Sequence, residues 1–365
     1  MTGAFRPTVA EVDLEAIRHN VRALKPPLAE LMAVVKADGY GHGDIPVARA
    51  ALEAGATWLG VAMVEEGLRL REAEIDAPIL VLSELPTGSE REAAAAGLTP
   101  TCYTDHGLRA LAEAGLGGGV HVKVDTGMHR VGLQPERAPP FCSAVREAGL
   151  QVEGVWTHFA RSEELDDPTT GEQLKRFEEA LDAVEAAGHR PRYRHAANSG
   201  ATMGWPDTHL DLVRVGIAMY GILPGPQLEG LVDLRPAMRL RSRVSMVKRL
   251  PAGEGISYGH RYRLERESTI ATVPIGYADG YMRALSNVGR VLIRGRRYPV
   301  AGTVTMDQLM VDCGEDPVER NDEVVLLGRQ GDQEIRAEEV AAWAGTIGYE
   351  VVTSVSARVP RVHRG

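Results

Sequence analysis

The feature that most constrains the fold is a repeated alternation of short apolar runs and helical patterns over residues 31–222. Each run ends in polar residues or glycine, as buried strands of a parallel sheet do. Eight strands alternating with helices at this chain length predict a (β/α)8 barrel of the TIM type, an α/β fold; an open doubly wound sheet is the alternative. The runs cover residues 31–37, 58–63, 78–83, 98–104, 120–125, 152–159, 193–197 and 212–222.

Most intervals between these runs carry a helical pattern. Phe177, Leu181 and Val184 share one helical face, for example, and Gly188 follows as a stop signal. Residues 14–24 predict a further helix, which follows a short alternating segment at residues 6–14. The run at 98–104 is the weakest of the predicted strands because Pro100 interrupts it.

The alternation stops after Leu223, where prolines and glycines break regular structure. We therefore place a domain boundary near residue 233, between a barrel at 1–233 and a second domain at 234–365. Alternating runs at 238–244, 268–274, 291–293 and 324–327, with one helix at 337–344, predict a mostly β second domain. Residues 1–13 are a candidate to pair with it.

Composition excludes several classes of protein. The formal net charge of −9, with both signs interspersed, argues against nucleic acid as a partner. No apolar run approaches the roughly 20 residues that cross a bilayer, and the first 20 residues lack a signal-peptide pattern. We therefore expect a cytoplasmic protein without membrane contact. Cys102, Cys142 and Cys313 are widely separated, so we expect reduced, mostly buried thiols and no metal site.

Lys36 is the first candidate functional residue. It ends the first buried run and precedes Gly39, Gly41 and Gly43, which permit a sharp turn and a close approach of the backbone to a ligand. Placing the charged amine of a lysine beside an apolar core costs free energy. A strand, a lysine and a glycine-rich turn suit an amine that meets a phosphorylated carbonyl cofactor. The alternative, a surface lysine in a tight turn, stays open at this stretch.

Polar residues also end or follow several of the later runs, and Arg214 and Gly216 lie within the last run. In a barrel the carboxyl ends of the strands meet at one rim, where the chemistry of this fold takes place. For any single residue, a structural hydrogen bond or ion pair is the alternative. A ring of charged groups at an apolar barrel nevertheless costs free energy unless it binds a ligand, so the set predicts a binding site. Its members are Lys123, Asp125, Arg130, His158, His195, Asn198, Ser199, Arg214 and Gly216.

Nine segments lie along nearly the whole chain at residues 33–43, 123–132, 157–159, 198–199, 213–221, 255–259, 275–280, 306–308 and 358–361. Together, and in matching order, they resemble the alanine racemase family. The resemblance implies a barrel that binds pyridoxal 5'-phosphate (PLP), a β domain after it, and interconversion of L-alanine and D-alanine, which supplies D-alanine for the peptidoglycan of the cell wall. A serine or broad-specificity racemase, an amino-acid decarboxylase and a non-catalytic PLP-binding barrel are the alternatives.

The resemblance implies that Lys36 binds PLP covalently and is one racemising base, and that Tyr258 is the second base on the opposite face of the substrate. Racemisation needs this arrangement, because one group removes the α-proton and another returns a proton from the other side. Arg214 would face the pyridine nitrogen. Since guanidinium does not readily yield a proton, the nitrogen stays largely unprotonated, and the weaker electron sink disfavours transamination.

The resemblance also implies the residues that surround cofactor and substrate. The phosphate would meet Tyr40, Ser199, Gly216, Ile217 and Tyr349, with Asn198 and His195 in support. His158 would lie near the cofactor ring or Tyr258, and Arg130 near the cofactor oxygen and the substrate carboxylate. Met306, Asp307 and Tyr277 would bind substrate or line its entrance.

Because Tyr258 and Met306 lie in the second domain, the resemblance further implies a head-to-tail homodimer, in which each β domain completes the active site of the partner subunit. Lys123 is a candidate for carbamylation, since the matching lysine of some members carries a carbamate that orients the residue matching Arg130. An unmodified Lys123 paired with Asp125 is the alternative, and the sequence leaves both open.

Overall fold

The computed structural model describes residues 5–365, and the chain divides into two compact units. The barrel unit comprises Ile17–Tyr40 and Asp44–Arg235, and the β unit comprises the described residues up to Ala16, Gly41–Gly43 and Pro236–Gly365. Within residues 5–365, no helix is long and apolar enough to cross a membrane. Cys102, Cys142 and Cys313 are buried free thiols, as the sequence predicts.

Within the described residues, the barrel unit is built on an eight-stranded sheet whose neighbouring strands are all parallel. Its strand order is β8-β7-β6-β5-β4-β3-β2-β9. The backbone N–H groups of Asp211 and Arg214 donate to the carbonyls of Arg194 and Ala197, 3.1 and 3.0 Å away, which links the two ends of this order. The predicted (β/α)8 barrel is confirmed. The strands are β2 (Glu30–Val34), β3 (Trp58–Val61), β4 (Ile79–Val81), β5 (Thr99–Cys102), β6 (Gly119–Lys123), β7 (Gln151–Trp156), β8 (Tyr193–His195) and β9 (Leu212–Val215).

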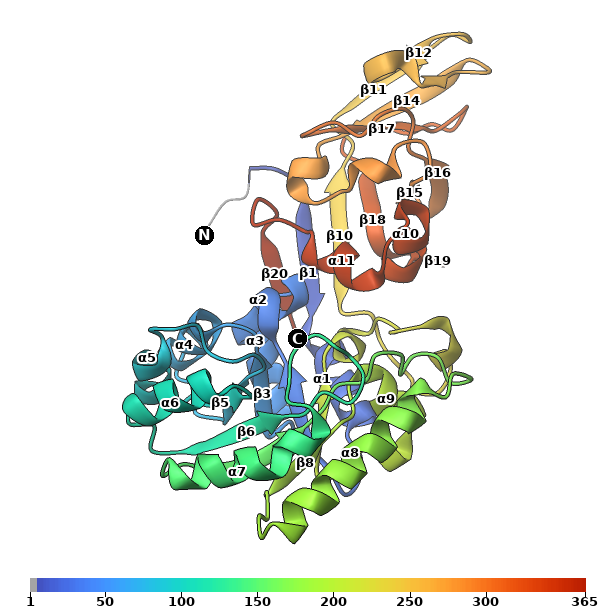
Figure 1. Ribbon diagram of the computed structural model, residues 1–365. Helices are drawn as coiled ribbons and strands as arrows, with labels where there is room; N and C mark the ends of the chain where they lie inside the picture. The colour runs from blue at the N-terminus through green and yellow to red at the C-terminus, as the bar shows by residue number, and fades with distance from the viewer. Residues whose placement is uncertain (1–4) are drawn as a thin grey trace. The chain divides into compact units, whose positions relative to one another are not determined.

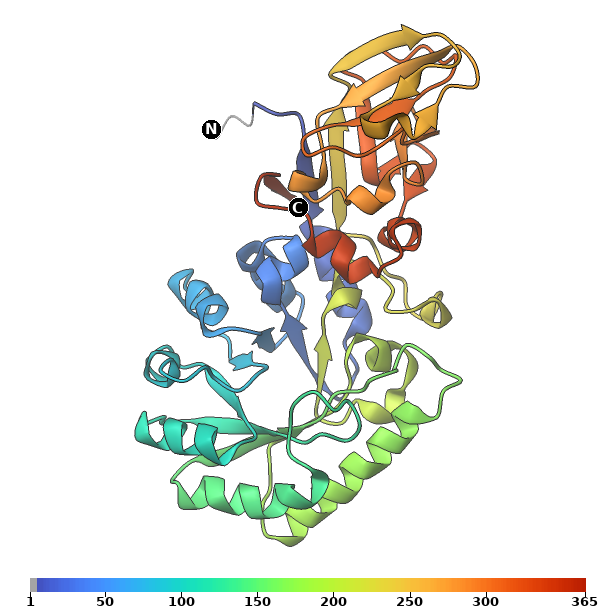
Figure 2. The same cartoon turned by 45° about the horizontal axis from the view of Figure 1, so that its top comes forward.

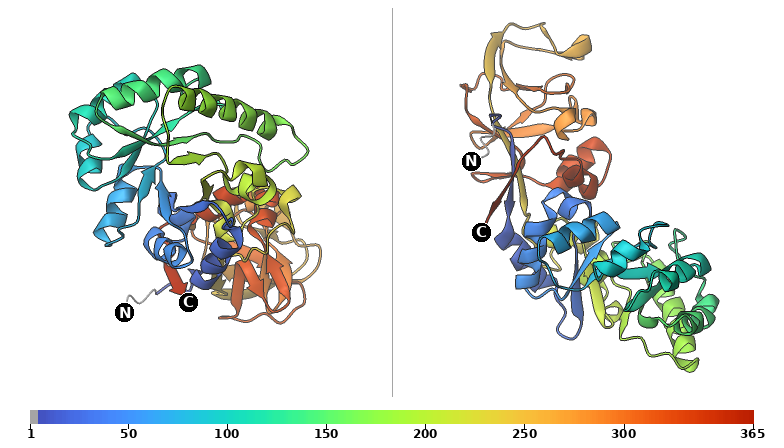
Figure 3. Two further views of the ribbon diagram at one scale, coloured as in Figure 1. Left: turned by 90° about the horizontal axis from the view of Figure 1, so that it is seen from below. Right: turned by 90° about the vertical axis from the view of Figure 1, so that its left-hand side faces the viewer.

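Helices cover the outer side of this sheet (Figure 3). The longest of them, α8, buries Phe177, Leu181 and Val184, the apolar face that the sequence predicts. On the inner side, large side chains of different strands pack together: Met32, Trp58, Leu80, Tyr193 and Leu212. The helices are α3 (Asp44–Glu53), α4 (Val64–Glu72), α5 (Glu90–Ala95), α6 (Asp105–Glu113), α7 (Ala138–Glu147), α8 (Thr169–Ala186) and α9 (Ser199–Gly204); α1 (Leu14–Leu24) precedes β2.

Pro100 is accommodated inside the predicted fourth strand. β5 pairs with β4 through Thr99 and Pro100, whereas it pairs with β6 only through Thr101 and Cys102. The two ladders therefore use successive halves of the strand, and the missing N–H of Pro100 interrupts neither.

The β unit contains three sheets among its described residues (Figures 1 and 2). In the largest, β1 (Val9–Asp13) pairs antiparallel with β10 (Met238–Arg243) and parallel with β20 (Arg361–Arg364). The remaining strands of that sheet are β15 (Arg290–Ile293), β16 (Arg296–Pro299), β18 (Glu323–Gln330) and β19 (Gln333–Ile335). The smaller sheets consist of β11 (Met246–Leu250), β14 (Ser268–Val273) and β17 (Leu309–Asp312), and of β12 (Gly255–Ile256) with β13 (Tyr262–Arg263).

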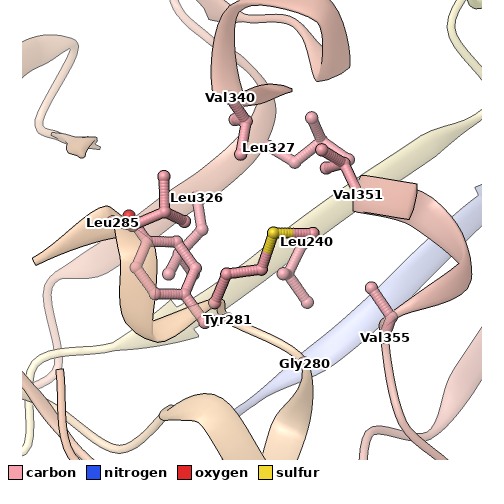
Figure 4. Close-up of a pocket in the computed structure, with 10 residues that line it drawn as sticks. Leu240, Gly280, Tyr281, Leu285, Leu326, Leu327, Val340, Val351 and Val355 are labelled. Atoms are coloured by element: carbon pink, nitrogen blue, oxygen red, sulfur yellow. The ribbon is translucent and has the colours of Figure 1, made fainter. Parts of the chain in front are cut away.

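The prediction of one helix in this region is wrong, because the β unit has α10 (Ala337–Ala344) and a second α-helix, α11 (Gly348–Thr353), within residues 236–365. The second is too short for an amphipathic period to register. Both helices contribute side chains to an apolar pocket of about 20 Å³, in which Val340 and Val351 face Leu240 and Tyr281 (Figure 4). The pocket has room for little more than a water molecule, so we assign it to the core of this unit.

Candidate active site

The first candidate, Lys36, begins an unusual turn, α2 (Lys36–Gly41), which follows β2. Ala37, Asp38, Gly39 and Tyr40 have φ of 54, 54, 59 and 51°, so the turn is left-handed. Left-handed helical geometry costs an L-residue on the order of 1–2 kcal/mol. The sequence predicts a sharp turn at the glycines, but it does not reveal that three other residues share this conformation.

One carboxylate, that of Glu66 on α4, holds the start of the turn. Its Oε1 accepts the backbone N–H of Ala37 at 2.7 Å, and its Oε2 accepts the N–H groups of Ala62 and Met63 at 2.8 and 3.2 Å. Glu66 is buried. Glu66 was not predicted from the sequence, since a glutamate in the first turn of a helix has no distinctive local pattern.

Lys36 is itself half-buried. Burial lowers the pKa of its amine, the positive charge of Arg130 lowers it further, and the Glu66 carboxylate opposes both effects. A lowered pKa increases the fraction of neutral amine near neutral pH, and the neutral form is the one that acts as nucleophile or base.

Tyr40, Ser199 and Gly216 form a cradle of neutral donors. The hydroxyl of Ser199 accepts the backbone N–H groups of Gly216 and Ala218 at 2.9 and 3.4 Å. A Cβ at Gly216 would lie 2.5 Å from the Tyr40 hydroxyl, so only glycine fits beside that tyrosine. Burial raises the pKa of Tyr40 and keeps its hydroxyl protonated. Ile217 extends this cradle as the first residue of a short 3₁₀ helix, η3 (Ile217–Tyr220).

Neighbouring side chains fix the cradle. Asn198 caps α9: its Oδ1 accepts the backbone N–H of Ala201 at 3.0 Å and the hydroxyl of Ser162 at 2.6 Å. The Tyr220 hydroxyl donates to the carbonyl of Val34 at 3.1 Å, and its ring lies 5.0 Å from that of Tyr40. The cradle is therefore tied to the strand that leads to Lys36.

Arg214 is buried at the centre of a ring of acceptors. Its Nη2 donates to the carbonyls of Thr157 and Ala196 at 2.7 and 3.0 Å, and to Nδ1 of His158 at 3.2 Å. Its Nη1 donates to Nδ1 of His195 at 3.1 Å. Burial lowers the pKa of Arg214 to about 9, which is still above neutral pH, so the guanidinium stays charged.

A guanidinium can only donate, and this fixes the protons of a chain of histidines. Nδ1 of His195 must accept, so its Nε2 carries the proton and donates to Nδ1 of His121 at 2.8 Å. Nε2 of His121 then faces Oε2 of Glu153 at 4.0 Å. Burial and Arg214 lower the pKa of His121 to about 3, so it is neutral. Of these residues, His195 was a candidate from the sequence, whereas His121 and Glu153 were not.

Nζ of Lys123 lies 4.4 Å from the centre of the Trp156 ring, and Cζ of the Arg214 guanidinium lies 4.7 Å from the same centre. Burial and the charge of Arg130 lower the pKa of Lys123 to about 7, with Asp125 opposing them. Oδ1 of Asp125 instead accepts the backbone N–H groups of Gly127 and His129, each at 3.0 Å.

The other candidates belong to the β unit. Tyr258 begins η5 (Tyr258–His260) and its side chain is exposed; the hydroxyl of Thr303 donates to its carbonyl at 3.0 Å. The backbone of Tyr277 donates to the carbonyl of Thr305 at 3.0 Å, next to the exposed Met306.

Asp307 follows Met306, and its carboxylate accepts a hydrogen bond from Arg358 at 2.7 Å. Tyr349 lies on α11 and is half-buried. Within the described part of the chain, no group of three or more His, Cys, Asp or Glu side chains could hold a metal ion.

Comparison with known proteins covers almost the whole chain. Residues 12–224 match the family model for the alanine racemase N-terminal domain, and residues 237–363 match that for the C-terminal domain. An alanine racemase of Symbiobacterium thermophilum is 52% identical over 369 residues, covering 99% of this chain and 98% of that protein.

Solved structures agree with this match. The crystal structure of alanine racemase from D-cycloserine-producing Streptomyces lavendulae has a TM-score of 0.93 and 44% identity, covering 99% of this chain and 97% of its own. That of alanine racemase from Bacillus anthracis with bound L-Ala-P has a TM-score of 0.92 and 40% identity, covering 99% of this chain and 96% of its own. The chain therefore belongs to the alanine racemase family of isomerases.

Proposed function

We propose that this protein interconverts L-alanine and D-alanine with PLP as its cofactor, and that it supplies D-alanine for peptidoglycan synthesis in the cytoplasm. One observation carries the proposal: an amine with a lowered pKa, that of Lys36, stands at the start of a constrained turn that also contains Tyr40, a member of the cradle. The match to alanine racemases of known structure supports the choice of substrate.

The residues present fit PLP. The cradle offers the hydroxyls of Tyr40 and Ser199 beside the backbone of Gly216 and Ile217, the kinds of group that hold phosphates at other barrel rims, and a side chain at Gly216 would clash with the Tyr40 hydroxyl. Tyr40, Ser199, Gly216 and Ile217 would hold the phosphate, with Tyr349 as a further ligand. Lys36 would bind the cofactor covalently, and Arg214 would face its ring nitrogen.

When bound, the cofactor supplies an electron sink for the electrons left behind as the α-hydrogen of alanine departs as a proton. Lys36 would take or return that proton at the α-carbon from one face, through its neutral amine. Tyr258 would do so from the opposite face through its phenolic oxygen. A single base would tend to return the proton to the face that it left, so two groups are needed for inversion.

Arg214 would weaken the electron sink that the cofactor supplies. Because its guanidinium donates to carbonyls and to Nδ1 atoms of neutral histidines, it has no acidic neighbour from which to pass a proton to the ring nitrogen. His158 would support Arg214, and Arg130 would bind the substrate carboxylate. Met306, Asp307 and Tyr277 would complete the substrate pocket and its entrance.

We propose that the sites are shared between two subunits, with Tyr258 supplied by the partner. The exposed side chains of Tyr258, Tyr277 and Met306 support an interface on the β unit. Co-expression of Lys36→Ala and Tyr258→Phe subunits tests this. Shared sites give one repaired site in each mixed dimer, whereas sites within one chain leave every site inactive.

Lys123 would carry a carbamate. With a pKa of about 7, much of its amine is neutral, and neutral amines add CO₂ to give a carbamate with loss of one proton. The negative product would offset the charges of Arg130 and Arg214 and orient Arg130 by a charge-assisted hydrogen bond. A carbon-13 NMR carbamate signal after growth with labelled bicarbonate supports this, and a signal that persists in Lys123→Ala contradicts the assignment.

The activity itself is tested with purified protein, PLP and each enantiomer of alanine, with serine as the competing substrate. We expect interconversion of the two alanines, faster than that of serine, and loss of activity in Lys36→Ala. A wild-type protein that racemises neither alanine would overturn the proposed function.

A further inference from the structure

We propose that helix α4 clamps the lysine turn from outside the site, with Glu66 and Arg69 as positioning residues that fix the direction of the Lys36 side chain. The catalytic consequence rests on the proposed function; the clamp itself does not. Both side chains leave the same helix three residues apart, so they lie on one face of it. They reach the two sides of the left-handed segment, Ala37 and Asp44.

The first contact of the clamp is to the peptide bond that joins Lys36 to Ala37. Its N–H donates to Oε1 of Glu66 at 2.7 Å. The N–H groups that start a helical turn lack partners within the turn, and a charged acceptor satisfies them well. Because this peptide plane defines how the chain leaves Lys36, holding it also holds the direction in which the lysine side chain departs.

The second contact is on the far side of the turn. Nε of Arg69 donates to Oδ2 of Asp44 at 2.7 Å, and the backbone N–H of Asp44 donates to Oδ1 of Asp38 at 3.2 Å. Asp44 is buried and Asp38 has left-handed backbone geometry. Arg69 thus anchors the residue that ties down the middle of the turn.

The clamp explains how a strained conformation persists. Ala37, Asp38 and Tyr40 would each be more stable in the right-handed or extended region, so the turn relaxes unless its surroundings hold it. Glu66 is well placed to do this, because its other oxygen is fixed by the N–H groups of Ala62 and Met63, at the end of β3 and the start of α4. The Glu66 carboxylate therefore links the backbone next to Lys36 to the end of β3, and this link restrains the start of the turn.

The test uses Glu66→Gln, which keeps the size of the side chain but leaves one acceptor oxygen for three N–H groups. Glu65→Gln is the matched control, since it makes the same change on the exposed neighbour in the same helical turn. Arg69→Gln is the second test variant, because its side chain is nearly half exposed and the change does not open the core.

The first readout is hydrogen–deuterium exchange of the backbone over residues 36–44, in the protein as purified and after removal of bound PLP with hydroxylamine. We expect exchange in both Glu66→Gln and Arg69→Gln to be at least about tenfold faster than in wild type and Glu65→Gln. This readout does not require activity.

The second readout is steady-state kinetics with alanine. A misdirected Lys36 lowers kcat by about 10- to 100-fold in Glu66→Gln, with little change in KM, because the reacting groups are misaligned while substrate contacts remain. Wild-type exchange in both variants, or normal kcat in Glu66→Gln despite faster exchange, overturns the inference. A wild-type protein without racemase activity overturns the proposed function instead, and the exchange comparison still decides whether the clamp exists.

Discussion

Replacing Gly216 with alanine tests the cradle most sharply. The new Cβ would lie 3.0 Å from Cζ of the Tyr40 ring, a tight contact, and 2.5 Å from the Tyr40 hydroxyl, an approach that real Cβ atoms essentially never make. Tyr40 is buried and its ring packs on Tyr220, so it has little room to move. Overpacking of this kind costs about 1–3 kcal/mol.

We therefore expect Gly216→Ala to lower the free energy of unfolding of the PLP-free protein by about 1–3 kcal/mol, measured by urea titration. PLP affinity should fall by about tenfold or more, measured by the absorbance of the bound cofactor, because the methyl group also occupies the cradle. The two measurements separate the steric clash from the loss of a ligand.

A double-mutant cycle identifies the clashing atom. Tyr40→Phe removes the hydroxyl at 2.5 Å and leaves Cζ at 3.0 Å, so adding it to Gly216→Ala should recover part of the lost stability, with a favourable coupling energy of about 0.5 kcal/mol or more. Additive effects, or a Gly216→Ala variant as stable as wild type, would refute this account of the cradle.

Three further predictions concern the buried titratable residues of the barrel. In CO₂-free buffer the free energy of unfolding should rise with pH between about 7 and 10.5, because the folded state holds fewer protons on Lys123 than the unfolded state. Urea titrations at several pH values should show a weaker rise with pH in Lys123→Met than in wild type, and an equal rise contradicts the low pKa of Lys123. Arg214→Lys should lower the free energy of unfolding by about 2–5 kcal/mol, since it leaves buried acceptors unpaired, and a loss below about 1 kcal/mol argues against that network. Nitrogen-15 NMR should show His195 and His121 neutral and protonated on Nε2, and a proton on Nδ1 of His195 contradicts the chain.

The barrel was predictable from local sequence because each strand is short, apolar and bounded, and because α8 repeats its apolar residues with a helical period. Pro100 interrupted the strand pattern at residues 98–104, yet β5 forms because β4 and β6 pair with different halves of it. A pattern in one strand contains no information on which of its N–H groups the adjacent strands require.

The strand pattern pointed to site residues that stand just after a strand. Lys36 and Ser199 occupy such positions, whereas His121 lies within β6 and Glu66 in a helix, and their partners come from distant parts of the chain. The left-handed turn could not be predicted for a similar reason. Ala37 gains its acceptor from α4, so tertiary contacts rather than local preference decide its backbone conformation.

Exchange of the α-hydrogen in heavy water tests the central claim, that Lys36 and Tyr258 act from opposite faces of the substrate. Each alanine enantiomer is incubated separately with wild type and with Tyr258→Phe, and deuterium at the α-carbon is followed by NMR. The account predicts that Tyr258→Phe abolishes exchange with one enantiomer and retains it with the other, through Lys36. Equal loss of exchange with both enantiomers would contradict it.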